Sequence, residues 1–156
     1  MQRGFFAREE LLELVSRVAR DVLGDNLVGI VVFGSSIYMG RGRDIDVLVV
    51  VREASSPKQV VSWELGILQG LREVLKRVAL DIHIVTLDDL RSGAGFVAGL
   101  ALGYRIALDL GGVEQAIREA LEKISREGPV LHNRYGSWDL RLFAEIALRS
   151  RKEEAE

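Results

Sequence analysis

The chain has 156 residues, of which 48% are hydrophobic and 28% are charged, as is typical of a folded globular protein. Because 21 basic residues stand against 23 acidic ones, the net charge is only -2, which argues against a strongly basic nucleic-acid-binding protein. The absence of cysteine excludes disulfide bonds, thiol catalysis and cysteine-ligated zinc.

The sequence predicts neither a signal peptide nor a membrane anchor. The N-terminal residues reach charged side chains before an apolar segment can form. The longest uncharged apolar stretch, Ser92 to Tyr104, is too short to span a bilayer and contains several glycines. We therefore expect a cytoplasmic protein with no membrane partner.

The first predicted elements are one helix and two strands. Apolar residues at helical spacing predict a helix from about Arg8 to Leu23, and Gly24 is a natural end for it. Two β-branched runs, Leu27 to Phe33 and Ile45 to Val51, predict buried strands. Since too few residues separate these runs for a helical crossover, we expect the two strands to be antiparallel.

The rest of the chain alternates helices and strands. Ser56 before Pro57 predicts the start of a helix that continues to about Arg77. The Gly128-Pro129 pair is expected to break a later helix and to begin a polar loop. The elements after the first 77 residues are expected at Ala79 to Val85 (strand), after Thr86 (helix, with a capping box to Asp89), at Tyr104 to Leu110 (strand), at Val113 to Arg126 (helix) and at Ser137 to about Arg151 (helix).

This order predicts an α/β (α+β) fold, in which helices pack on a mixed β-sheet of about four strands, with a helical C-terminal extension. Residues 1–112 would form the main domain, and residues 113–156 would be C-terminal helices packed on it. We favour the interpretation that the apolar residues near the last helix cover the sheet, and the alternative is a dimer or partner surface. These residues are Trp138, Leu142, Phe143 and Ile146.

Two carboxylates stand at the entrance of the second predicted strand. Asp44 and Asp46 are two residues apart, so the alternation of a strand places both on one face. Neighbouring carboxylates repel each other, and a divalent cation that prefers hard oxygen ligands, Mg²⁺ or Mn²⁺, removes this penalty. The alternative is that both aspartates are solvated at the strand entrance.

Two further positions could take part in chemistry. Gly34-Ser35 follows the first strand, where a glycine allows close approach and a serine can bind an anionic oxygen, although the same pair marks ordinary turns. Asp81 lies in the third predicted strand, where a carboxylate is costly unless it is paired, bound to a metal or at an edge of the sheet. His83, two residues on, is assigned no role.

Together these residues resemble the nucleotidyltransferase superfamily that includes DNA polymerase β, and in particular its minimal members from archaea and bacteria. Gly34-Ser35, eight intervening residues, Asp44-Ile45-Asp46 and then Asp81 form the motif, and the match covers about Leu27 to Leu110. The resemblance implies that Gly34 and Ser35 hold the β- and γ-phosphates of a nucleotide. It also implies that Asp44 and Asp46 ligate two Mg²⁺ ions.

The third carboxylate of the family corresponds to Asp81, which by resemblance binds the catalytic metal and helps to deprotonate the acceptor hydroxyl. The sequence departs from the family in two places. The spacer before Asp44 is shorter than usual, and Arg43 stands where a serine commonly precedes the Asp-x-Asp pair. Arg43 would contact the phosphate oxygens of the nucleotide, with a solvated loop arginine as the alternative.

The resemblance implies a Mg²⁺-dependent transfer of a nucleoside monophosphate, AMP from ATP, to a hydroxyl acceptor. Minimal members of the family are often paired with a small helical partner protein in toxin–antitoxin systems and transfer AMP to it. The alternative is a non-catalytic binding module of the same fold that neutralises or regulates a partner by contact. Nucleic acid is not expected as a partner, and the sequence leaves a homodimer open.

Overall fold

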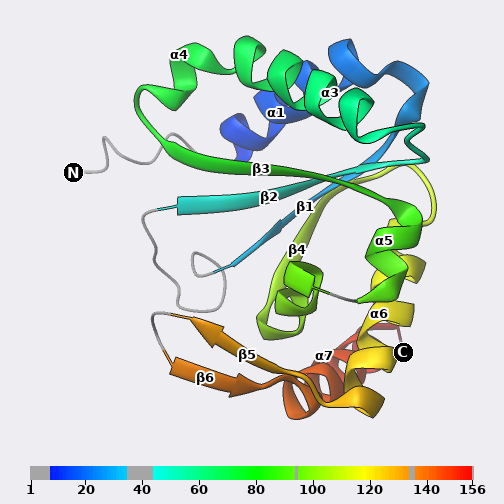
Figure 1. The fold of residues 1–156 in the computed structure, drawn as a ribbon. Coiled ribbons are helices and arrows are strands. Elements are labelled where there is room, and N and C mark those ends of the chain that lie inside the picture. The colour runs from blue at the N-terminus through cyan, green and yellow to red at the C-terminus, as the bar shows by residue number, and fades with distance from the viewer. Residues whose placement is uncertain (1–7, 35–43, 94, 134–135, 156) are drawn as a thin grey trace.

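A four-stranded mixed sheet lies at the centre of the molecule (Figure 1). The computed structural model describes residues 8–34, 44–93, 95–133 and 136–155, and only the backbone of residues 8, 44, 96, 133 and 151–155. The strands are β1 (Leu27–Phe33), β2 (Asp44–Val51), β3 (Ala79–Thr86) and β4 (Tyr104–Asp109), in the spatial order β3-β2-β1-β4. β1 is antiparallel to β2 and β4, whereas β2 and β3 are parallel, which confirms the predicted mixed sheet.

One face of the sheet is covered by two long helices, α1 (Arg8–Leu23) and α3 (Pro57–Gly70), together with the short η1 (Gly24–Asn26) and α4 (Arg72–Leu75) (Figure 1). The two long helices pack closely, because a Cβ atom on Gly70 would lie 2.6 Å from a methyl carbon of Val18. Ser56 caps α3 as predicted, but this helix ends at Gly70, and the predicted continuation to Arg77 is interrupted.

The opposite face is covered by α5 (Leu87–Ser92), the 3₁₀ segment η2 (Gly95–Leu102), α6 (Val113–Glu127) and α7 (Leu140–Ala155). Thr86 and Asp89 form the predicted capping box at the start of α5. The apolar side chains of α6 are buried as its helical spacing predicts: Val113, Ala116, Ile117, Ala120, Leu121 and Ile124. Among the described helices, none is both long and apolar enough to cross a membrane.

A β-hairpin stands where we had predicted a polar loop and the start of a helix. Its strands, β5 (Val130–Asn133) and β6 (Gly136–Asp139), pair Leu131 with Trp138 across the hairpin, and α7 begins only at Leu140. The prediction was wrong because each strand is so short that its alternation cannot be distinguished from a loop in the sequence. Trp138 therefore belongs to a strand, and its ring packs edge-on against Phe143 of α7, with the ring centroids 6.0 Å apart.

Only two of the four apolar residues singled out near the last helix cover the core. Trp138, of β6, and Phe143 pack against the core cluster under α6 and α7, as expected for side chains that cover the sheet. Leu142 and Ile146 are instead 58% and 48% exposed. Covering the core therefore explains only part of this apolar set.

Candidate functional site

Two of the predicted carboxylates are direct neighbours in the sheet. The parallel register of β2 and β3 places Asp46 opposite Asp81, and the antiparallel register of β1 and β2 places Phe33 on the other side of Asp46. Adjacent strands lie about 4.8 Å apart, and in-register residues project to the same face. The end of β1 and the beginnings of β2 and β3 lie together at one end of the sheet (Figure 1).

This candidate site lies on the face of the sheet that carries α5 and α6. Phe33 and Leu48 belong to the core cluster on that face, and Asp46 shares their side by the alternation of β2. Asp46 is half-buried, whereas Asp81 is exposed. The pair thus stands where the apolar core gives way to solvent, as a site that admits a polar substrate requires.

The rings of Phe33 and His83 form an aromatic pair next to the carboxylates. His83 follows Asp81 at the next position on the same face of β3, and its ring centroid lies 6.2 Å from that of Phe33, with the rings tilted by 57°. His83 is half-buried. The sequence analysis assigns this histidine no role. The alternation of β3 places it on the face of Asp81, and the register of β3 with β2 puts it near the site.

Gly34, at the end of β1, is in direct contact with Asp46 of β2. It ends β1 with a φ of +89°, a backbone conformation that favours glycine. A Cβ atom at this position would overlap the carboxylate of Asp46, so the side chain of Asp46 lies directly against the bare Cα of Gly34. The glycine is therefore required both by the turn and by the carboxylate that packs on it.

The other predicted site residues can be placed only in part. Ser35 and Arg43 lie outside the described residues. Asp44 is described by its backbone alone, which begins β2 opposite Ala79 of β3. The structure thus brings together Gly34, Asp46 and Asp81 of the predicted set.

The structure distinguishes between the alternatives that the sequence leaves open for Asp81. β3 is an edge strand and Asp81 is exposed between the buried Leu80 and Ile82, so the edge-position alternative describes its surroundings. Its register with Asp46, rather than burial, makes Asp81 a candidate for chemistry.

The donor atoms at the site suit a hard divalent cation. Asp46 and Asp81 offer carboxylate oxygens from adjacent strands, which are the ligands that Mg²⁺ and Mn²⁺ prefer. Among the side chains that the structure describes, which do not include that of Asp44, no group of three or more acidic or histidine residues gathers into a metal site. The residues present therefore fit such an ion in kind, as an incomplete ligand set.

Comparisons with known proteins place the fold. No family model and no curated protein matches the chain. A spectinomycin adenyltransferase from Enterococcus faecialis, solved with ATP and spectinomycin, is 18% identical with a TM-score of 0.50; the match covers 76% of this chain and 66% of that one. The chain thus spans slightly less than two thirds of that adenyltransferase.

Two toxin–antitoxin structures are similar to a comparable degree. A chain of a complex with AMP-PNP is 19% identical, with a TM-score of 0.51 and coverage of 74% of this chain and 88% of that one. A chain of the complex of tri-AMPylated Shewanella oneidensis HEPN toxin with MNT antitoxin is 15% identical, with a TM-score of 0.52 and coverage of 76% and 88%. At these identities the likeness shows a shared fold, and it confirms the fold that the resemblance implies.

Proposed function

Since the chain has the fold of the minimal nucleotidyltransferases, we propose that it is a Mg²⁺-dependent enzyme that transfers AMP from ATP to a hydroxyl acceptor. The observation that carries this proposal is the register of Asp46 with Asp81, beside a glycine whose bare Cα receives the Asp46 carboxylate. The solved structures with ATP, with AMP-PNP and with an AMPylated toxin support an adenine nucleotide as the donor.

In the proposed reaction, the acceptor oxygen attacks the α-phosphorus of ATP, the bond from that phosphorus to the bridging oxygen breaks, and pyrophosphate leaves. Asp81 accepts the proton of the attacking hydroxyl, because it is the exposed member of the carboxylate pair. Asp44 and Asp46 would hold two metal ions, and Asp81 would be a further ligand of the catalytic one. When bound, these ions neutralise charge on the triphosphate and on the leaving pyrophosphate.

The remaining predicted residues would position the nucleotide. Gly34 and Ser35 would hold the β- and γ-phosphates, since the backbone turns at Gly34 and the serine offers a hydroxyl and an N–H. Arg43 would contact phosphate oxygens as a charged donor. In the proposed arrangement the triphosphate would lie beside Asp46, at the end of β1.

The proposed acceptor is a hydroxyl of a small helical partner protein, as in a toxin–antitoxin pair. Two of the three solved structures contain such a pair, and one of these contains an AMPylated toxin. Asp81 is exposed on an edge strand, so a side chain of a folded partner can approach it from outside the sheet. We place this reaction in the cytoplasm, in keeping with the absence of cysteine.

The first test measures nucleotide binding by calorimetry. ATP is titrated into the wild type and into an Asp44→Asn/Asp46→Asn variant, with Mg²⁺ and with EDTA. We expect binding that requires Mg²⁺ and disappears in the double variant. Asp21→Asn, which changes an exposed aspartate of α1 on the other side of the sheet, should bind as the wild type does. If the double variant binds as tightly as the wild type, the metal assignment is wrong.

The second test separates binding from transfer. ATP labelled at the α-phosphate is incubated with the candidate partner, and the label should move to the partner as pyrophosphate is released. Asp81→Asn should keep nucleotide binding and lose turnover by roughly a hundredfold or more, the usual contribution of a positioned proton acceptor. A partner complex that forms without transfer, and that ignores all three aspartates, would favour the non-catalytic binding module.

A further inference from the structure

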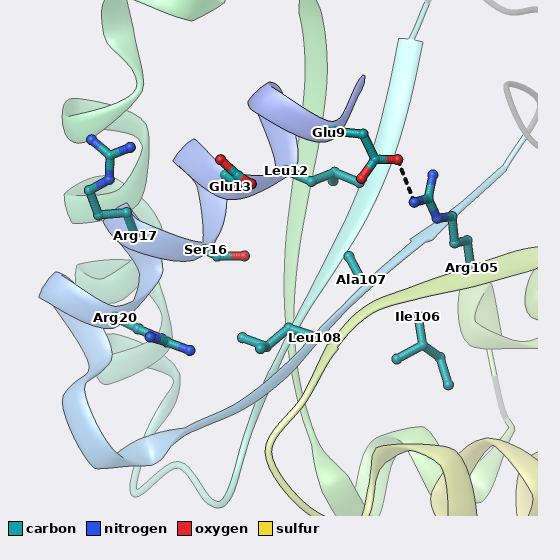
Figure 2. Close-up of a pocket in the computed structure, with 10 residues that line it drawn as sticks. All are labelled: Glu9, Leu12, Glu13, Ser16, Arg17, Arg20, Arg105, Ile106, Ala107 and Leu108. Carbon is teal, nitrogen blue, oxygen red and sulfur yellow. Dashed lines mark hydrogen bonds and ion pairs between the residues drawn. The ribbon is translucent and has the colours of Figure 1, made fainter. Parts of the chain in front are cut away.

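A separate hollow lies between α1 and the edge strand β4, on the face of the sheet opposite the carboxylates (Figure 2). Its volume is about 570 Å³. We call it the α1–β4 groove, and its lining residues are Glu9, Leu12, Glu13, Ser16, Arg17, Arg20, Arg105, Ile106, Ala107 and Leu108.

The floor of the α1–β4 groove is apolar. Leu12 is buried, and Ala107 and Leu108 are half-buried parts of the core cluster on this face. In the described chain, the helices on this side of the sheet are α1, α3 and the short η1 and α4, and α3 packs towards β3, at the opposite edge from β4. No helix of the described residues therefore covers the outer flank of α1 and the adjacent face of β4.

The shape of β4 favours a helix over a strand as the occupant. The register with β1 shifts between Ile30 and Val31, which leaves Ala107 as an extra residue between Ile106 and Leu108. Such a bulge twists an edge strand and disturbs the regular ladder that an added strand would need. The hollow beside α1, in contrast, presents a helix flank against which a second helix can pack.

The charges on the groove side of α1 are separated along the helix. Glu9 and Glu13 stand near its beginning, and Arg17 and Arg20 near its end. Glu9 accepts a hydrogen bond from Arg105 of β4 at 2.6 Å, whereas Glu13, Arg17 and Arg20 have no ion pair within the described residues. Figure 2 shows Arg20 reaching towards Leu108, at the other end of the groove from the Glu9–Arg105 pair.

We propose that the α1–β4 groove binds a second copy of this chain, with the two α1 helices packed antiparallel about a two-fold axis near Ser16. In this arrangement Glu13 faces the partner's Arg17, and Glu9 faces the partner's Arg20. In an antiparallel pair of identical helices, facing residues have a nearly constant sum of residue numbers, and both of these pairs meet this condition. Ser16 places a small side chain where the helices cross.

The identical copy is the occupant whose charge fits this surface. The α1 flank carries equal numbers of acidic and basic side chains in separate halves, so it is complementary to itself when reversed. A strongly acidic or basic partner would meet repulsion in one half. Because α1 lies on the other face of the sheet from Asp46 and Asp81, both nucleotide sites of the dimer would remain open.

The test is sedimentation velocity of the full chain, from about 1 to about 100 μM. The wild type should sediment at twice the chain mass of 17.3 kDa. With Glu13→Arg or Arg17→Glu alone, positions 13 and 17 carry like charges, and the two-fold axis repeats this repulsion at two places in the dimer. Each variant should therefore weaken dimerisation roughly tenfold or more. Glu10→Arg, which reverses an exposed glutamate of α1 outside the groove, is the matched control and should leave the dimer unchanged.

The decisive sample is an equimolar mixture of the Glu13→Arg and Arg17→Glu chains. In the mixed dimer, position 13 of each chain meets position 17 of the other with opposite charge, so association should return to the wild-type level. This rescue depends on contact between chains, and a role of the charges within one helix would not produce it. A monomeric wild type, a mixture that stays monomeric, or equal disruption by Glu10→Arg would each overturn the proposal.

Discussion

Gly34 connects the backbone of β1 with the carboxylate of Asp46. Its φ of +89° is unfavourable for any other residue, and the space that a Cβ would need is already filled by the Asp46 side chain. Gly24 also has a positive φ, of +56°, but no atom lies within 4 Å of a Cβ added there. Gly24 is thus a control position at which an added Cβ meets no other atom.

We predict that Gly34→Ala destabilises the protein by roughly 2–3 kcal/mol, and that Gly24→Ala costs about 1 kcal/mol. The additional loss at Gly34 combines the overlap with Asp46 and a backbone φ farther from the left-handed region. Urea unfolding of both variants measures the difference, and calorimetry should show weakened Mg²⁺-dependent ATP binding for Gly34→Ala alone. Equal losses of stability would show that the contact with the carboxylate has no energetic consequence.

At the scale of an element, α6 depends on a side chain outside the helix. Its N-cap residue is Gly112, which has no side chain to accept a hydrogen bond. The carboxylate of Asp109, at the end of β4, accepts from the backbone N–H groups of Gly111, Val113 and Glu114, at 2.8, 3.2 and 3.0 Å. Asp109 thus replaces the missing cap and joins the end of β4 to the start of α6.

We predict that Asp109→Ala lowers the free energy of unfolding by about 1–2 kcal/mol, since several N–H groups at the start of α6 lose their acceptor. Asp109→Asn should lose less, because its amide oxygen can still accept from Gly111 and Val113. Asp88→Ala, which removes an exposed aspartate paired with Arg91, should change stability by less than about 0.5 kcal/mol. Urea unfolding compares the three, and an Asp109→Ala as stable as Asp88→Ala would contradict the capping role.

The whole molecule has two core layers that share one sheet, and each contains one of its two tryptophans. Trp63 packs against the cluster under α1 and α3, and Trp138 packs against the cluster under α6 and α7. Because β1 contributes buried side chains to both clusters, we predict that the layers unfold together.

Trp63→Phe and Trp138→Phe each leave one tryptophan to report on one layer. In each variant, the unfolding midpoint measured by fluorescence should equal the midpoint measured by circular dichroism. If the fluorescence midpoint of Trp63→Phe, which keeps Trp138, lies below its circular dichroism midpoint, the C-terminal helices unfold as a separate unit. The division at residue 112 predicted from the sequence stays a prediction until then.

Much of the fold followed from short-range signals. Ser56-Pro57 and the Thr86–Asp89 box mark helix starts through contacts within four residues, and both are formed as predicted. The antiparallel pairing of β1 and β2 follows from the short connection between them. The β5–β6 hairpin was missed because Leu131 and Trp138 become a cross-strand pair only once the turn between them forms.

The candidate site was less predictable, because it depends on pairing between distant segments. The alternation in β2 indicates which face Asp46 occupies, but the position of Asp81 beside it requires β2 and β3 to be adjacent, parallel and in one register. Local sequence specifies none of these three conditions. The contact of Gly34 with the Asp46 carboxylate likewise arises from the β1–β2 register.

The position of α6 and α7 late in the chain has a consequence for synthesis on the ribosome. β1 and β2 emerge early and carry rows of buried aliphatic residues, but the helix that covers much of one face of the sheet begins only at Val113. Until α6 leaves the exit tunnel, Leu48 and Val50 lack that cover. Nascent chains that pause before this point expose an apolar sheet surface, which is the kind of surface through which incomplete chains aggregate.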